Sequence, residues 1–238
     1  MDTYLGILDL LLQSPVANRN TEIWITKEDL AASERWIPVS WKGDPLAVLV
    51  TGGTAKRKQW VPQRYAQVVQ RLREKDTHLY FLLLGGSEDY EDAEIIARAT
   101  GPEACINLAG KMSFRQSAAI MQRCCFYMGS DTGTMHIAAA INLPVLELNC
   151  FPADHPQCRD MGVVSCRPYR VPSVIVQPPH GLDECQKPGD AYGCRRQNQR
   201  HCILQITPEL VVKGYQRLQE LVTAHIPKTL FLSDKINP

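Results

Sequence analysis

The stretch that decides the fold spans residues 46–53 and reads Leu46-Ala47-Val48-Leu49-Val50-Thr51-Gly52-Gly53. Its first five residues are all apolar, a pattern typical of a β-strand that is buried on both faces. The two glycines that follow allow the backbone to turn tightly and to approach a ligand closely. A strand of this kind needs covering elements on both sides, which indicates a sheet between two layers of helices.

Outward from this stretch, short apolar runs alternate with segments of helical spacing. Further strands are expected at residues 79–84, 106–108, 125–128 and 145–148, and helices at about 62–72, 88–100, 113–123 and 134–141. This alternation predicts an α/β fold, a Rossmann-like doubly wound parallel sheet. Because ligands bind such sheets beyond the carboxyl ends of the strands, the loops of interest are 51–60, 85–89, 129–134 and 149–160.

The two flanks of this region lack the alternation. Residues 4–12 favour a short helix, and residues 22–25 favour a short strand within polar sequence. Residues 150–205 are rich in proline and cysteine, and a final helix is expected from Pro208 to about residue 224. The predicted organisation is an N-terminal helix and linker at 1–43, a Rossmann-like domain at 44–226 with an irregular excursion at 150–205, and a poorly ordered tail at 227–238.

The composition excludes several classes of protein. The chain has 26 basic and 25 acidic residues and a net charge of +1, which argues against nucleic acid as a partner and allows at most a peripheral association with a membrane. No basic segment precedes an apolar core at the N-terminus, and no run of about 18 apolar residues exists. The odd number of cysteines, nine, favours reduced thiols. We therefore expect a cytoplasmic protein, with the inner face of the cytoplasmic membrane as a possible location.

The strongest local motif lies where an expected strand ends and a helix begins, at Gly129-Ser130-Asp131-Thr132-Gly133-Thr134-Met135-His136. The start of a helix presents free N–H groups and a positive dipole end, so this turn predicts a phosphate site; the alternative is an ordinary capped turn. His136 could donate to a diphosphate oxygen or pair with the backbone as a core histidine. Asp131 could hold loop N–H groups or position a sugar, and a carboxylate beside a phosphate requires a Lys or Arg nearby.

Two further loops could complete such a site. The loop after the first strand offers Thr51, Gly52, Gly53 and the basic cluster Lys56-Arg57-Lys58, whose hydroxyl, N–H groups and charges suit a diphosphate. It lacks the spacing of a Walker loop, and its alternative interpretation is a solvated basic turn. In the loop at residues 85–89, Glu88 or Asp89 could accept hydrogen bonds from a ribose, or could simply favour the start of a helix.

The cysteines of the irregular excursion are a weaker candidate for a metal site. The candidate ligands are Cys166, Cys185, Cys194 and Cys202, and no two of them have the C-x₂-C spacing of common zinc sites. A zinc site, a disulfide and free thiols therefore all remain open, with free thiols favoured.

Together these loops resemble glycosyltransferase family 9, which contains the lipopolysaccharide heptosyltransferases. The family's D-[ST]-G-x-x-H-[IL]-A-A-A segment, followed by x-x-x-P, is matched by residues 131–140 with Pro144. Its lysine before an aromatic residue and a proline is matched by Lys58, Trp60 and Pro62. Its N-L-A-G-K-[TM]-S and I-T-P-E segments are matched by residues 107–113 and 206–209. The resemblance covers about residues 44–225.

The resemblance implies one half of a GT-B glycosyltransferase, in which the C-terminal Rossmann-like domain holds a nucleotide-diphospho-sugar, often ADP-heptose. It implies that Lys58 contacts donor phosphate, that Glu88 contacts the ribose, and that residues 131–133 contact the diphosphate or sugar. The reaction is inverting and requires neither a metal nor a cofactor. The implied acceptor is a glycolipid of the lipopolysaccharide core type.

The chain departs from the family in two places. The loop after the last strand usually reads G-P-T-D-P, and here only Pro152, Asp154 and Pro156 are similar. In addition, residues 1–40 are too short to form the family's N-terminal domain, which supplies the acceptor site and the catalytic base, so no catalytic residue is assigned. The alternatives are a catalytically silent donor-binding module, a module complemented by a separate N-terminal domain chain, and a Rossmann-like domain for another nucleotide.

Overall fold

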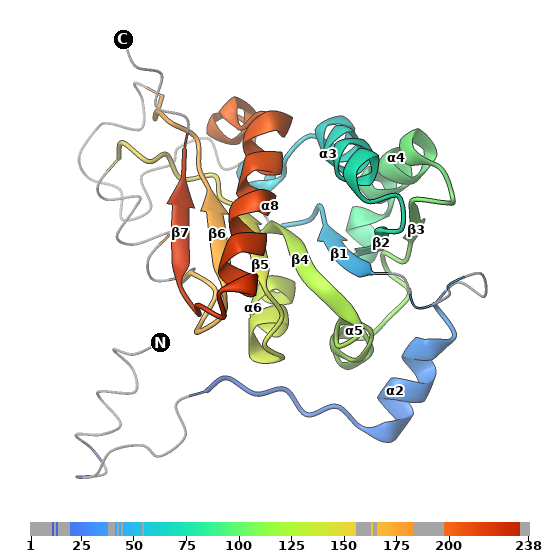
Figure 1. Cartoon of the computed structure of the whole chain (residues 1–238). Coiled ribbons are helices and arrows are strands. Elements are labelled where there is room, and N and C mark those ends of the chain that lie inside the picture. Colours follow the sequence, from blue (N-terminus) through green and yellow to red (C-terminus); the bar gives the residue numbers. More distant parts are fainter. Residues whose placement is uncertain are drawn as a thin grey trace.

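A computed structural model of the chain describes residues 11, 13, 20–37, 41, 43, 45–53, 55–155, 163, 166–182 and 198–233. Its centre is a seven-stranded parallel sheet with the strand order β3-β2-β1-β4-β5-β6-β7 (Figure 1). The strands are β1 (Leu46–Val50), β2 (Tyr80–Leu84), β3 (Cys105–Asn107), β4 (Cys124–Ser130), β5 (Val145–Leu148), β6 (Ser173–Val176) and β7 (Thr229–Leu232).

The helices of the described chain cover both faces of this sheet. They are α2 (Lys27–Glu34), α3 (Pro62–Lys75), α4 (Tyr90–Thr100), α5 (Phe114–Met121), α6 (Gly133–Ala140) and α8 (Pro208–Thr223), with short 3₁₀ turns η1 (Lys56–Lys58), η2 (Ser87–Asp89) and η5 (Cys202–Gln205). Helices α3, α4 and α8 pack on one face and α5 and α6 on the other, with α2 against α5 (Figure 1). The prediction of a doubly wound α/β fold is confirmed.

The strand order identifies where a ligand would bind. The chain builds outward from β1 through β2 to β3, and then returns to the other side of β1 to begin β4. Loops that leave the carboxyl ends of β1 and β4 therefore diverge toward opposite faces and leave a crevice between them. The turn η1 and the start of α6 follow these two strands directly.

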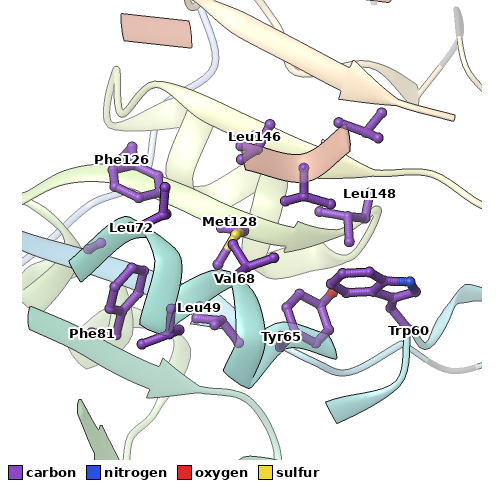
Figure 2. Close-up of a cluster of buried hydrophobic side chains, with 14 of the residues drawn as sticks. Leu49, Trp60, Tyr65, Val68, Leu72, Phe81, Phe126, Met128, Leu146 and Leu148 are labelled. Atoms are coloured by element: carbon purple, nitrogen blue, oxygen red, sulfur yellow. The ribbon is translucent and has the colours of Figure 1, made fainter. Parts of the chain in front are cut away.

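The core explains why these segments fold as they do. Along β1, Ala47 and Leu49 pack in the cluster under α3 and α8, whereas Leu46, Val48 and Val50 pack in the cluster on the other face. Figure 2 shows the first cluster, in which side chains of α3 face those of β1, β2, β4 and β5. The Trp60 and Tyr65 rings meet edge to face at 4.9 Å, and the Trp60 Nε1–H donates to the Ile206 carbonyl. This contact ties the η1 loop to the segment before α8.

Side-chain caps begin two of the helices that the sequence predicts. Ser113 begins α5 with a capping box, in which its hydroxyl accepts from the Gln116 N–H. Thr207 caps α8 by accepting from the Leu210 N–H, and Pro208 occupies the first turn. Such caps satisfy N–H groups that have no partner inside the helix.

The structure corrects the predictions for the flanks. Residues 22–25 are not a strand, and Trp24 is 83% exposed; instead Thr26 and Asp29 form a capping box that starts the polar helix α2. The excursion at 150–205 is not irregular throughout, because it contains β6, and residues 229–232 of the expected tail form β7. Both strands extend the sheet beyond β5. The helix expected at 4–12 lies almost entirely outside the described residues.

Candidate functional site

A cavity of about 550 Å³ lies at the carboxyl ends of β1, β2 and β4. It is lined by the loops after these strands, by the start of α5 and by the start of α6. The lining residues are Val50, Gly52, Gly53, Lys58, Gly85, Gly86, Glu88, Asp89, Met112, Ser113, Phe114, Ser117, Asp131, Thr132, Gly133, Thr134, His136 and Cys166. Its volume is in the range of small-molecule sites, about 300–1,000 Å³.

The start of α6 forms one wall of the cavity. Thr132 is the N-cap in extended conformation, and its side chain makes no capping hydrogen bond. The N–H groups of the first turn therefore lack a side-chain acceptor of the kind that capping residues supply. A Cβ atom added to Gly133 would meet nothing within 4 Å, so open space lies in front of this turn. Free N–H groups and the positive end of the helix dipole make this wall suited to an anion.

Asp131 lies between two cationic or polar partners. Lys58 Nζ is 2.7 Å from its Oδ2 and also donates to its carbonyl at 3.2 Å, and His136 Nε2 is 3.7 Å from its Oδ1. Burial acts to raise the pKa of Asp131, but the hydrogen bond with His136 and the charge of Lys58 outweigh it, and the pKa is lowered. Asp131 is therefore ionised at neutral pH. The expectation of a basic residue beside Asp131 is confirmed.

Lys58 reaches Asp131 because its loop is held at several points. The Ser130 hydroxyl donates to the Lys58 carbonyl at 2.6 Å, and Gln59 Nε2 donates to the Gly53 carbonyl at 3.0 Å. The neighbouring Arg57 is buried. One of its guanidinium nitrogens lies 3.0 Å from Cys150 Sγ, and the guanidinium carbon lies 4.9 Å from the centre of the Phe151 ring. Lys58 is thus oriented before any ligand arrives.

Asp89 joins the loops after β1 and β2. Its carboxylate accepts from the Gly86 N–H at 2.9 Å, and burial raises its pKa. A Cβ at Gly52 would lie 2.2 Å from this carboxylate, and one at Gly85, whose φ is +154°, would lie 2.4 Å from it. The two glycines are therefore needed for Asp89 to sit between their loops.

The structure brings together all of the residues assigned to donor binding except Thr51, and of the basic cluster only Lys58 lines the cavity. Gly52, Gly53, Lys58, Glu88, Asp131, Thr132, Gly133, Thr134 and His136 line the cavity. Thr51 does not; it is buried, and its hydroxyl has no hydrogen-bond partner among the described residues.

Sequence reasoning missed one side of the cavity, formed by Met112, Ser113, Phe114 and Ser117. The helical spacing of Phe114 with Ala118 and Met121 predicts a buried side chain. It is instead 71% exposed at the first position of α5. A better signal was its place directly after the N-cap Ser113, where a side chain projects from the end of the helix rather than along its buried face.

The cysteine candidates do not form a metal site in the described part of the chain. Cys166 lines the cavity and Cys202 is buried in the core, whereas Cys185 and Cys194 lie outside the described residues. No group of three or more His, Cys, Asp or Glu residues suited to a metal occurs among the residues described. Within the same ranges, no helix has the length and apolar character needed to cross a membrane.

Comparisons with known proteins agree on one family. The family model "Glycosyltransferase family 9 (heptosyltransferase)" matches residues 4–155. The chain is 35% identical over 100 residues to lipooligosaccharide heptosyltransferase 2 of Haemophilus influenzae, a match that covers 40% of this chain and 28% of the relative. It is 32% identical over 99 residues to lipopolysaccharide heptosyltransferase 2 of Escherichia coli K12, covering 40% and 27%.

A solved structure of a family 9 glycosyl transferase from Veillonella parvula superposes with a TM-score of 0.72 at 20% identity, covering 92% of this chain and 59% of that one. The ADP-heptose lipopolysaccharide heptosyltransferase II of Escherichia coli gives 0.61 at 20% identity, covering 86% and 54%. The chain therefore spans little more than half the length of these solved relatives, and its match to the curated relatives covers about a quarter of each.

Proposed function

The chain belongs to glycosyltransferase family 9 (heptosyltransferase), and from this premise we propose that the described domain binds a nucleotide-diphospho-sugar donor, ADP-heptose, for transfer to a glycolipid acceptor of the lipopolysaccharide core type. The proposal assigns residues 44–226, together with β7, to the donor-binding domain, and residues 1–43 to an N-terminal helix and linker. It places the protein in the cytoplasm, at the inner face of the membrane where such an acceptor would lie.

One observation carries the proposal: Lys58 and the start of α6 face the same cavity at the crevice between β1 and β4. An ammonium group has three N–H donors, and two of those of Lys58 are directed to the carboxylate and carbonyl of Asp131. The third is left for a phosphate oxygen. A diphosphate against Lys58 and the N–H groups of residues 133 and 134 would meet fixed positive potential on two sides.

Other residues that line the cavity suit a nucleoside. Met112 and Phe114 provide apolar side chains, and the Glu88 carboxylate lies close to Gly86. An aromatic ring and a thioether pack well against a purine base, and a carboxylate accepts hydrogen bonds from ribose hydroxyls. Glu88 therefore keeps the ribose role that the family resemblance implies.

In the proposed reaction, an acceptor hydroxyl attacks the anomeric carbon while the nucleoside diphosphate leaves. This chain's own residues act on the leaving group: Lys58 and the α6 N–H groups stabilise the negative charge that develops on the diphosphate. Asp131 holds Lys58 in place and His136 lies beside both. The acceptor site and the base that takes the proton are assigned to the family's other domain, whether on the same polypeptide or on a separate chain.

Isothermal titration calorimetry with ADP, UDP and GDP tests donor binding. ADP should bind, and UDP and GDP should bind at least about tenfold more weakly, a difference of about 1.4 kcal/mol. Asp131→Ala should weaken ADP binding without unfolding the domain, because it frees Lys58 from its orienting partner. Glu91→Ala, which removes an exposed acid of α4, is the control. Unchanged ADP affinity in Asp131→Ala would remove Asp131 from the site, and the absence of any nucleotide binding would refute the proposal.

A second assay separates the active enzyme from a silent module. Transfer from ADP-heptose to a lipid A-core acceptor should be measured with the chain alone and with an added N-terminal domain from a family member. Product formed by the chain alone supports an enzyme, product formed only after addition supports a complemented module, and no product in either case restricts the proposal to donor binding.

A further inference from the structure

A buried acid that the proposed reaction does not use lies in the middle of β5. Glu147 is 1% exposed, and its neighbours in the sheet are Gly129 of β4 and Ile175 of β6. Its Oε1 accepts from the Asn149 side-chain amide at 2.5 Å, and its Oε2 has no hydrogen-bond partner among the described residues. A buried polar atom without a partner is rare in folded proteins and calls for an explanation.

The side chain points toward the face of the sheet that α5 and α6 cover. Leu146 and Leu148, on either side of it, pack in the cluster under α3 and α8, and Val145 packs in the opposite cluster with Met135 and Ala138 of α6. Since side chains alternate along a strand, Glu147 lies on the same side as Val145. Figure 1 shows α6 against β5 on this side.

Glu147 lies beside the strand that leads into the anion-binding turn. Its sheet neighbour Gly129 is two residues before Asp131 and carries no side chain; a Cβ there would lie 2.5 Å from the Val50 carbonyl and 2.8 Å from the Tyr127 hydroxyl. The carboxyl group is close enough to interact electrostatically with Asp131 and Lys58, and the cavity-lining Cys166 interacts with it in turn. Glu147 does not line the cavity itself, but with Asp131 and Lys58 it forms an interacting group behind the proposed diphosphate position, which we call the floor.

The charge state of Glu147 follows from these surroundings. Burial raises its pKa to about 8, the Asp131 carboxylate adds to this effect, and the Asn149 amide and Lys58 oppose it. Among the described residues, the other titratable groups that interact with it are the Tyr127 phenol of β4 and the Cys166 thiol. Burial raises the pKa of Tyr127 well above its usual value and also raises the pKa of Cys166. At neutral pH the floor therefore holds one ionised acid, Asp131, one neutral acid, Glu147, and one cation, Lys58.

We propose that Glu147 is a proton-holding positioning residue of the donor pocket: it stays a neutral acid while a nucleoside diphosphate occupies the pocket, and donor binding is linked to its protonation. This inference rests on the proposed function, because it requires an anion in the cavity. A neutral acid adds no charge beneath the diphosphate and leaves the ammonium of Lys58 to be shared between Asp131 and a phosphate. An ionised Glu147 would add a second negative charge to the floor and compete for the same cation.

The sign of the linkage is fixed. A bound diphosphate adds negative charge near Glu147, which disfavours its ionised form and raises its pKa above the value in the free protein. Below about pH 7, Glu147 is neutral in both the free and the bound protein, so affinity does not depend on its proton. Above pH 8 the free protein has lost that proton, and binding must take it up again, so affinity falls by up to about tenfold per pH unit.

Calorimetry with ADP at pH 6.5, 7.5, 8.5 and 9.0 tests this inference with wild type, Glu147→Gln and Glu91→Gln, a matched change at an exposed acid of α4. Wild type and E91Q should lose roughly five- to tenfold in affinity between pH 7.5 and 9.0, the loss expected for a group that titrates near pH 8. E147Q, which carries a permanently neutral side chain, should have nearly the same affinity at both pH values. An identical loss in E147Q would overturn the inference.

A measurement on wild type alone does not depend on the folding of any variant. At pH 8.5, where the phosphates of ADP are fully ionised, binding enthalpies in buffers of different ionisation enthalpy report the number of protons taken up. With a pKa of about 8, about three quarters of the free protein has lost the Glu147 proton at this pH. An uptake approaching about 0.75 proton supports the linkage, and no uptake refutes it. Failure of ADP to bind at any pH would instead refute the proposed function, so the two failures are distinguishable.

Discussion

Two acids of neighbouring strands, near the same edge of the sheet, differ in charge: Asp131 is ionised at neutral pH and Glu147 is neutral. Asp131, directly after β4, lies 2.7 Å from Lys58 Nζ, and its pKa is lowered. Glu147, in β5, meets an amide and no cation within hydrogen-bond distance among the described residues, and its pKa is raised to about 8. Both side chains are mostly buried, at 11% and 1% exposure. The comparison teaches that contact with His136 and Lys58, and not depth alone, decides which buried acid ionises here.

The largest expected effect comes from removing Lys58, the cation that contacts Asp131 but not Glu147. Lys58→Met leaves Asp131 with His136 as its remaining partner and removes the N–H group proposed for the phosphate. ADP affinity should fall at least about 100-fold, roughly 3 kcal/mol, because a charge-assisted contact is lost and a buried carboxylate is left facing the anion.

Calorimetry at pH 7.5 measures this change, with Lys75→Met at the exposed end of α3 as the control. The pKa of Asp131, followed by NMR of its carboxyl carbon, should rise in the Lys58 variant. A loss of affinity equal to that of the Lys75 variant would contradict the role given to Lys58.

The second prediction tests how closely β4 is packed at Gly129, which pairs with Glu147 and precedes Asp131 by two residues. Gly129→Ala places a Cβ 2.5 Å from the Val50 carbonyl, and a backbone atom inside a sheet cannot move away easily. The free energy of unfolding should fall by about 3 kcal/mol, as for other overpacked cores. Gly133→Ala makes the same change four residues later, where nothing lies within 4 Å, and should change it by less than about 0.5 kcal/mol. Urea unfolding compares the two variants, and equal destabilisation would show that the strand end is not close-packed.

The third prediction tests the neutrality of Glu147 through stability. Its pKa in the folded protein lies above the value in the unfolded chain, about 4.3, so its contribution to stability is fully present below pH 4.3 and is lost as pH rises toward 8. Glu147→Gln does not lose a proton on unfolding. At pH 7.5 it should be more stable than wild type by up to about 4 kcal/mol, a rise in Tm of up to roughly 8–16 °C, and the difference should fall below about 1 kcal/mol near pH 4.5. A variant less stable than wild type at pH 7.5 would mean that Glu147 is ionised and paired.

The sequence predicted strands that are buried on both faces, because burial on both faces requires a continuous apolar run. Residues 46–50 and 79–84 lie between neighbouring strands and under helices on both faces, so nearly every position is apolar. The strand β6 was missed because Pro172 and Pro178 bracket only five residues, four of which form the strand. Its burial comes from pairing with β5 and packing under α8. The edge strand β7 follows Pro227, and its side chains are partly exposed. Because its pairing partner is β6, its sequence alone does not distinguish it from a C-terminal tail.

The candidate site was predictable to the extent that backbone turns determine it. Glycines at strand ends and the start of α6 identified the loops, and the need to neutralise Asp131 identified Lys58. Glu147 was not predictable as part of the floor, since one acid within Val-Leu-Glu-Leu does not reveal which residue faces it on the next strand. Thr51 follows β1 directly, but the site takes its contacts from Gly52, Gly53 and Lys58 instead.

The smallest expected effect concerns the buried Arg57, which holds η1 in the position that lets Lys58 reach Asp131. Its guanidinium lies over the Phe151 ring and against Cys150 Sγ, so it joins η1 to the loop after β5, where the chain departs from its family. Arg57→Met keeps an apolar stem but loses the N–H contact and the cation–π interaction. ADP affinity should fall by about fivefold, roughly 1 kcal/mol, because η1 becomes less well ordered before binding.

The exposed neighbour Lys56 provides the matched control for this change. Lys56→Met removes the same charge from the same turn without touching Cys150 or Phe151. If long-range charge alone determines the contribution of this basic turn, the two variants should lose the same affinity, and both losses should shrink in high salt. If Arg57 acts by holding η1, its loss should exceed that of Lys56→Met and persist in 0.5 M salt. The second result would show that the contact between Lys58 and Asp131, which Glu147 lacks, itself depends on the packing of Arg57.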